Sequence, residues 1–231
     1  TCALPISADG LIGDYFSYKW SFQSFNKHFV DSRYILWAPK DTKINEFIRG
    51  RIKRSETVEK GKYRRFEWAA QNTPVLKPEA SMPSSSDVAW YLEVSTVPDW
   101  GLFLKWEDAI LQDVFRTSPE VISLAERLIE GKKTKLEKLY AIHEYLVTKI
   151  RYQQDYENYV AGVKPHTAPQ VIARGYGDCK DKSVLFITLA KLAGIEARFA
   201  LVRTRNFGQI IKEVPSQQFN HVILCVPMEQ D

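Results

Sequence analysis

The sequence predicts an α+β protein in two parts. An antiparallel β-sandwich-like domain is expected over residues 1–100, followed by a helix-rich α+β core over residues 101–231. Three observations support this: polar–apolar alternation in the first hundred residues, helical apolar spacing after them, and a composition typical of globular domains. That composition is 45% hydrophobic and 26% charged residues in a chain of 231. The change from strand-like to helical spacing of apolar residues places the boundary between the two domains near residues 98–105.

Strand patterns fill the first part. Residues 14–23 (DYFSYKWSFQ) place aromatic side chains on one face and mainly polar ones on the other, as in a half-buried strand. Similar patterns recur in residues 32–37, 45–54, 62–70 and 88–97. Gly61 suits a hairpin turn between two of these segments. Residues 72–87 are rich in Pro and Ser and poor in apolar residues, so we expect a loop there.

Helix signals begin in the second part. Residues 107–116 fit a short helix, and Ser118 is an N-cap that precedes a proline at the first helical position. Thr134 begins another helix with a T-x-x-E capping box. His143 falls on the apolar stripe of that helix. We therefore interpret His143 as a core or half-buried histidine rather than a catalytic one.

The charge balance argues against a nucleic-acid partner. The chain has 32 Lys and Arg against 28 Asp and Glu, a net charge of +4, and no dense basic block. No apolar run reaches the roughly 18 residues of a membrane-spanning helix, so no transmembrane segment is expected. The oligomeric state is not determined by these features.

The number of cysteines and the identity of the first residue bear on disulfide bonding and on removal of an upstream segment. Cys2, Cys179 and Cys225 cannot all pair within one chain, so disulfides are not expected to be the main stabiliser. The chain starts at Thr1 without a signal-peptide pattern. We expect that an upstream segment has been removed.

Residues 175–194 (GYGDCKDKSVLFITLAKLAG) are the most informative segment. Asp178 and Asp181 predict an N-cap and a capping box, which place Cys179 at the first helical position. Unpaired N–H groups and the helix dipole stabilise a thiolate there, and the thiolate is the nucleophilic form of cysteine. Nearby lysines add to this effect and the two aspartates oppose it. From spacing alone, a nucleophile and a small buried hydrophobic residue are equally good interpretations of Cys179.

A thiol nucleophile needs a base, and His221 is the best placed of the four histidines. It opens FNHVILCV, a segment with strand propensity. A cysteine at a helix start and a histidine on a neighbouring strand is the arrangement of papain-like thiol enzymes. A surface histidine at a strand start is the alternative. A metal site of Cys179 with His221 or Cys225 lacks the spacing typical of zinc ligands, so no metal and no cofactor are expected.

Residues 164–204, together with FNHVILCVP, resemble the transglutaminase-like superfamily. They are most similar to bacterial members in which a β-sandwich domain of unknown function precedes the core. In that family G-Y-G-D-C-K-D-K marks the nucleophile helix and N-H-V opens the strand of the catalytic histidine. The I-R-Y ending at Tyr152 and the P-H ending at His166 also match. The first part resembles the preceding domain in W-S-F-Q and Y-I-L-W-A-P.

The resemblance implies a papain/transglutaminase-like core that acts on peptide or amide carbonyls through a Cys179 thioester, with His221 as general base. The expected substrate is a protein or peptide, with hydrolysis favoured over transamidation. The Cys179 N–H is the expected oxyanion donor. Further oxyanion or substrate-site candidates are Tyr152, Tyr176, Gly177, Asp178 and Asn220. For Tyr152, a structural role is the alternative. The resemblance also implies a bacterial envelope or exported protein.

The family's third catalytic residue is an Asp that orients the histidine, in a W-x-D-P-T-like context on the next strand. We expect this carboxylate to lie beyond Asp231, with Asp231 itself as the weaker candidate. The core would then be C-terminally truncated, and the sandwich-like domain N-terminally incomplete. The alternative function is a non-catalytic protein- or glycan-binding module with a degenerate or incomplete Cys-His-Asp triad.

Overall fold

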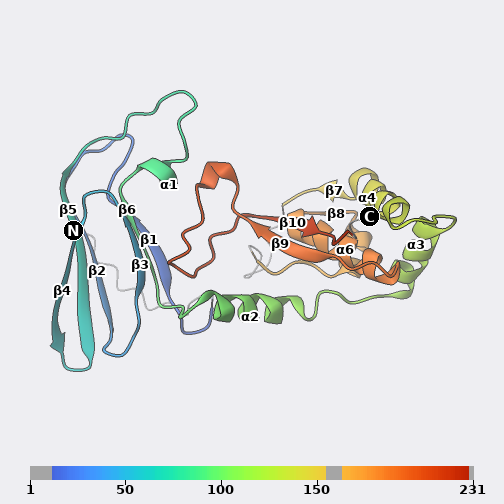
Figure 1. Cartoon of the computed structure of the whole chain (residues 1–231), viewed down its shortest axis with the longest axis horizontal. Coiled ribbons are helices and arrows are strands. Elements are labelled where there is room, and N and C mark those ends of the chain that lie inside the picture. The colour runs from blue at the N-terminus through green and yellow to red at the C-terminus, as the bar shows by residue number, and fades with distance from the viewer. Residues whose placement is uncertain (1–11, 155–162, 229–231) are drawn as a thin grey trace. The chain divides into compact units, whose positions relative to one another are not determined.

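The computed structural model describes residues 12–154 and 163–228 (Figure 1). The chain folds into two compact units. The first runs to Trp106 and also contains Arg203–Gln218, while the second contains Glu107–Val202 and begins again at Phe219. We call residues 203–218 the strap. The predicted α+β class is confirmed. The predicted limits of the two domains stay a prediction.

The first unit contains two three-stranded antiparallel sheets, ordered β1-β6-β3 and β2-β5-β4. Their strands are β1 (Ser17–Ser21), β2 (Phe29–Pro39), β3 (Asn45–Arg49), β4 (Lys53–Lys60), β5 (Tyr63–Thr73) and β6 (Tyr91–Ser95). Buried side chains of both sheets form one core, including Phe66 and Trp68 of β5 with Leu92 and Val94 of β6. Aromatic residues dominate this core because each buries a large apolar area.

Strand β6 is buried on both faces, which polar–apolar alternation did not predict. Leu92 and Val94 face the sandwich core, while Glu93 and Ser95 point the other way and are buried as well. The strap covers this second face: Ser95 Oγ donates to Pro215 O at 2.5 Å. A short helix, α1 (Ser85–Val88), precedes β6, where the sequence predicted a loop and then a strand.

The second unit surrounds one central helix with other helices and a hairpin. Its elements are the last residues of α2 (Trp100–Leu111), then α3 (Pro119–Ile129), α4 (Lys135–Lys149), α5 (Ala168–Arg174), α6 (Cys179–Leu192) and the antiparallel pair β9 (Arg198–Val202) and β10 (His221–Cys225). A two-residue parallel pair joins β7 (Arg151–Tyr152) to β8 (Tyr176–Gly177). The strap, which includes the short 3₁₀ helix η1 (Arg205–Phe207), connects β9 to β10.

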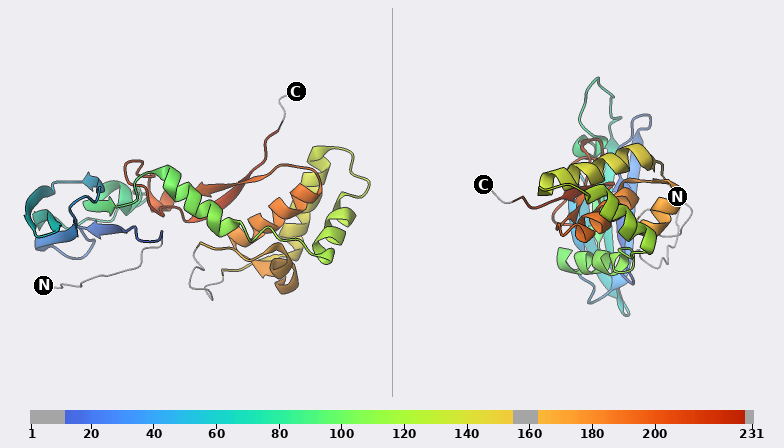
Figure 2. Two further views of the ribbon diagram at one scale, coloured as in Figure 1. Left: turned by 90° about the horizontal axis from the view of Figure 1, so that it is seen from below. Right: turned by 90° about the vertical axis from the view of Figure 1, so that its right-hand side faces the viewer.

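Helix α6 is the core of the second unit. Helices α3, α4 and α5 and strand β10 pack against it, and Figure 2 shows these helices from two further directions. Val184, Leu185 and Leu189 are fully buried in one cluster. The sequence predicted a single apolar face on this helix. Neighbours on several sides instead bury most of its residues, including polar ones.

Local capping predictions are confirmed, whereas two assignments are wrong. Ser118 caps α3, and Thr134 begins α4 with a complete capping box. The helix expected over residues 107–116 is α2, which starts earlier, at Trp100. His143 is exposed, because α4 turns Ile142 and Leu146 inward and leaves the neighbouring position open. Within the described residues, no helix combines the length and apolar character that a bilayer span requires.

We predict that Leu189→Ala lowers the stability of the second unit by about 2–5 kcal/mol, because it removes a fully buried side chain and leaves a cavity. Leu192→Ala is the matched control on the same helix, since Leu192 is 37% exposed, and it should cost less than about 1 kcal/mol. Urea unfolding followed by far-UV circular dichroism measures both. Equal losses would contradict the central place of α6.

Candidate active site

The start of α6 is held by reciprocal hydrogen bonds, and Cys179 is its first residue, as predicted. The Asp178 carboxylate accepts from the N–H groups of Lys180 at 3.1 Å and Asp181 at 3.3 Å. The Asp181 carboxylate accepts from the Asp178 N–H at 3.2 Å. The capping box thus satisfies the donors around Cys179 and leaves the thiol half-buried at the positive end of the helix dipole.

Tyr152 is the predicted candidate that the structure brings to the thiol. The Tyr152 hydroxyl hydrogen-bonds with the side chain of Cys179 and with its backbone N–H. Partial burial raises the pKa of Tyr152, and the neighbouring Cys179 and Asp178 raise it further. Tyr152 is therefore a neutral phenol, able to donate a hydrogen bond, at physiological pH. The β7–β8 pairing positions it, with Gln153 N–H donating to Gly177 O at 3.1 Å.

Asp181 connects α6 to the start of α5. His166 donates its backbone N–H to Asp181 Oδ1 at 2.7 Å, and its ring Nδ1 lies 3.3 Å from each carboxylate oxygen. A side chain on Gly177 would place its Cβ 2.6 Å from the Cβ of Asp181. Glycine is required at this position by close approach. Asp178 in turn forms a buried ion pair with Lys180.

The remaining candidates have other surroundings. The Tyr176 ring makes cation–π contacts with Arg151 and Arg174, whose guanidinium carbons each lie 5.8 Å from the ring centre. Asn220 is exposed, and its N–H donates to Val202 O at 3.1 Å, which begins the β9–β10 pairing.

His221 is the first residue of β10 and pairs in register with Val202. Strand β10 packs on α6, the helix that begins with Cys179. Within the two described ranges, no hydrogen bond joins the His221 ring to the Cys179 thiol. Catalytic hydrogen bonds are often long before substrate binds. Cys225, at the other end of β10, is exposed. Cys2 and Asp231 lie outside the described residues.

Sequence reasoning missed helix α5 and the role of His166 at its start. The signal was present in T-A-P-Q: Pro169 fits the first turn, and Gln170 Oε1 accepts from the Thr167 N–H at 2.9 Å. This is the glutamine form of a capping box. The tie between His166 and Asp181 had no local signal, because it joins residues 15 positions apart.

A helix that begins with a cysteine and packs against a strand that begins with histidine has the arrangement of elements found in papain-like thiol enzymes. Residues 122–229 match the family model of the transglutaminase-like superfamily, in agreement with the resemblance found in the sequence.

One solved structure supports the fold. The crystal structure of a putative protease from Parabacteroides distasonis matches 92% of this chain with a TM-score of 0.73 and 16% identity. The chain spans 41% of that protein's length. A putative cysteine protease from Cytophaga hutchinsonii matches 92% of this chain and 74% of its own at 14% identity, but its TM-score of 0.39 adds nothing to the fold assignment. No curated protein matches the sequence.

We predict that Tyr152→Phe slows alkylation of Cys179 by iodoacetamide about threefold to tenfold at neutral pH. The variant loses a hydroxyl hydrogen bond to the thiolate. The effect is smaller than for a fully buried bond because Tyr152 is 55% exposed. Tyr140→Phe on α4, where Tyr140 is 66% exposed, is the control and should react like the wild type. Identical rates in all three proteins would contradict the contact.

Proposed function

We propose that this chain is a thiol enzyme that acts on peptide or amide carbonyls through a Cys179 thioester, with hydrolysis favoured over transamidation. One observation carries the proposal: within a transglutaminase-like segment, the Cys179 thiol lies at a capped helix start beside the Tyr152 hydroxyl. This places a candidate nucleophile at the positive end of the helix dipole, next to two hydrogen-bonding groups.

In the first step, the Cys179 thiolate attacks the carbonyl carbon and the carbonyl oxygen becomes an oxyanion. The Cys179 N–H and the Tyr152 hydroxyl, adjacent to the sulfur, are the proposed donors for that oxyanion, and the Cys179 N–H exchanges the Tyr152 oxygen for the oxyanion in this step. The C–N bond then breaks, and His221 passes the proton it took from the thiol to the leaving amine. The product of this step is a thioester on Cys179.

In the second step, the acceptor decides the activity. Water attacks the thioester with His221 as base, which releases a carboxylic acid and restores the thiol; an amine would instead give a new amide. The relative from Parabacteroides distasonis is named a putative protease, which favours water as the acceptor.

The polar residues around the thiol have a supporting role. Asp178 and Asp181 would by themselves place two negative charges beside a thiolate, which disfavours that thiolate. The Lys180 ammonium offsets the charge of Asp178 through their ion pair. The Asp181 carboxylate accepts hydrogen bonds from the Asp178 and His166 N–H groups. The capping residues can therefore hold the helix start without cancelling the attraction of its dipole for the sulfur.

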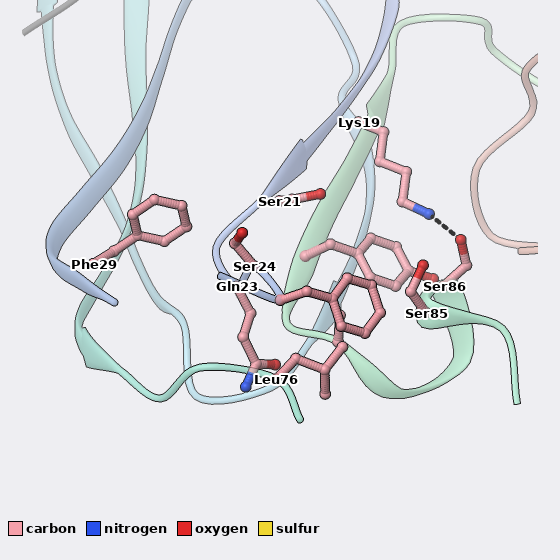
Figure 3. A pocket seen from close by; sticks show the side chains of 11 residues that line it. Lys19, Ser21, Gln23, Ser24, Phe29, Leu76, Ser85 and Ser86 are labelled. Carbon is pink, nitrogen blue, oxygen red and sulfur yellow. Dashed lines mark hydrogen bonds between the residues drawn. The ribbon is translucent and has the colours of Figure 1, made fainter. Parts of the chain in front are cut away.

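A second candidate function is a non-catalytic binding module, favoured by a pocket in the first unit (Figure 3). The pocket has a volume of about 370 Å³ and is lined by serine hydroxyls, aromatic rings and one lysine. Lys19 Nζ donates to Ser86 Oγ at 2.8 Å and lies 4.0 Å from the centre of the Tyr91 ring. Hydroxyl groups next to aromatic rings suit a small polar ligand such as part of a glycan.

We predict that an activated ester of a blocked peptide acylates Cys179 of the wild-type protein, with the adduct located by mass spectrometry. Cys179→Ala should abolish the adduct, and His221→Ala should slow its formation about 100-fold or more, because the general base is lost. Cys225→Ala is the matched control, since Cys225 is an exposed thiol of the same chain, and it should label like the wild type.

The proposal fails if Cys225 is acylated as fast as Cys179, or if His221→Ala labels at the wild-type rate. Either result would leave Cys179 as an ordinary thiol and favour the binding module. An amine added with the ester separates the two acceptors: predominant release of the free acid supports hydrolysis, and predominant release of the amide supports transamidation.

A further inference from the structure

We propose that Gln218 is a positioning residue for His221, because it fastens the strap that joins the two strands of the β9–β10 pair. This inference rests on the proposed function in one respect: it takes His221 to be the base. Figure 1 shows the strap in orange-red between the end of β9 and the start of β10.

The Gln218 amide is buried, and all four of its hydrogen-bond positions are used. Its Oε1 accepts from Ile211 N–H at 2.8 Å and from Arg203 Nη1 at 3.1 Å. Its Nε2 donates to Ile211 O at 2.9 Å and to Val214 O at 2.6 Å. An amide has one acceptor oxygen with two lone pairs and two N–H donors, so this side chain is fully paired and has one orientation.

These bonds join the two ends of the strap. Arg203 directly follows Val202, the register partner of His221, and Gln218 lies three positions before His221 in the chain. The Arg203–Gln218 hydrogen bond therefore closes the strap at the end of the strand pair. Closer to β10, Asn220 N–H donates to Val202 O at 3.1 Å. Arg203 is held in turn by Phe207 O, which accepts from Nε and Nη2 at 3.0 and 2.8 Å.

The middle of the strap is fixed to the rest of the first unit by contacts between residues distant in sequence. Besides the Ser95 bond to Pro215, Ser216 Oγ donates to Glu93 Oε1 at 3.3 Å, and both residues are buried. Near α1, Gln209 N–H donates to Asp87 Oδ1 at 2.9 Å. Gly208, with φ +86°, permits this approach, because a Cβ there would lie 2.8 Å from the same Asp87 oxygen.

The backbone is what holds His221 in the described structure. No hydrogen bond to the His221 ring is present among the residues that the structure describes, so the ring is not fixed by a side-chain partner there. A general base must be presented in one orientation to accept a proton efficiently. The strand start that carries His221 is ordered by its pairing with Val202, and that pairing by the closed strap.

The experiment compares Gln218→Leu and Arg203→Ala with the exposed strap variant Glu213→Gln in the full chain. The first readout is hydrogen–deuterium exchange of the Asn220 amide, with the amide of Cys225, at the far end of β10, as internal reference. We expect about tenfold or faster exchange at Asn220 in both test variants, since each loses hydrogen bonds that close the strap. Cys225 and the control variant should be unchanged. Arg203→Ala changes a half-buried side chain, which keeps the test valid if Gln218→Leu does not fold.

The second readout is the rate of Cys179 alkylation against pH, which a purely structural role would not move. We expect the two test variants to shift the profile in the same direction as His221→Asn, and Arg203→Lys, which keeps a donor, to give an intermediate profile. Wild-type exchange at Asn220 in both test variants would overturn the inference, and so would faster exchange with a wild-type alkylation profile. If His221→Asn itself leaves the alkylation profile unchanged, the proposed function fails. Unchanged exchange of the Asn220 amide in the two test variants would, separately, show that Gln218 does not position His221.

Discussion

The unpaired N–H groups at the start of α6 are the constraint on which the rest of the site depends. A helix start inside a protein must find acceptors for those groups, and here Asp178 and Asp181 supply them. Their presence requires glycine at position 177 and brings His166 against Asp181. The arrangement satisfies the backbone while leaving the Cys179 sulfur at the helix end, beside Tyr152.

The strap belongs to the first unit, although in the chain it lies between β9 and β10 of the second. The bonds that hold it to β6 join residues separated by 120 and 123 positions, so the strap is completed only after both parts of the chain are made. Contacts between residues so far apart in the chain cost loop-closure entropy, which local hydrogen bonds do not offset. The strap buries the polar face of β6. This burial raises the pKa of Glu93, and the positive charges of Lys19 and Arg203 oppose that rise.

Local features were predictable and long-range ones were not. The caps at Ser118 and Thr134 and the helix start at Cys179 involve residues three or four positions apart, so their patterns are legible in the sequence. The burial predicted for His143 was wrong because helical spacing shows which residues share a face of the helix. It does not show which part of that face a neighbouring element covers. Glu93 and Ser95 are buried by a segment more than a hundred residues away in the chain. The polar–apolar alternation within residues 88–97 therefore could not predict their burial.

Short-range patterns of residue type were enough to predict the α+β class, the capped helix that begins with Cys179, and the resemblance of that segment to transglutaminase-like proteins. Three contacts could be found only in the folded chain: Tyr152 with Cys179, Asp181 with His166, and Gln218 with Arg203 in the strap. They join residues from separate segments, which are brought together by packing and long-range hydrogen bonds rather than by local preference.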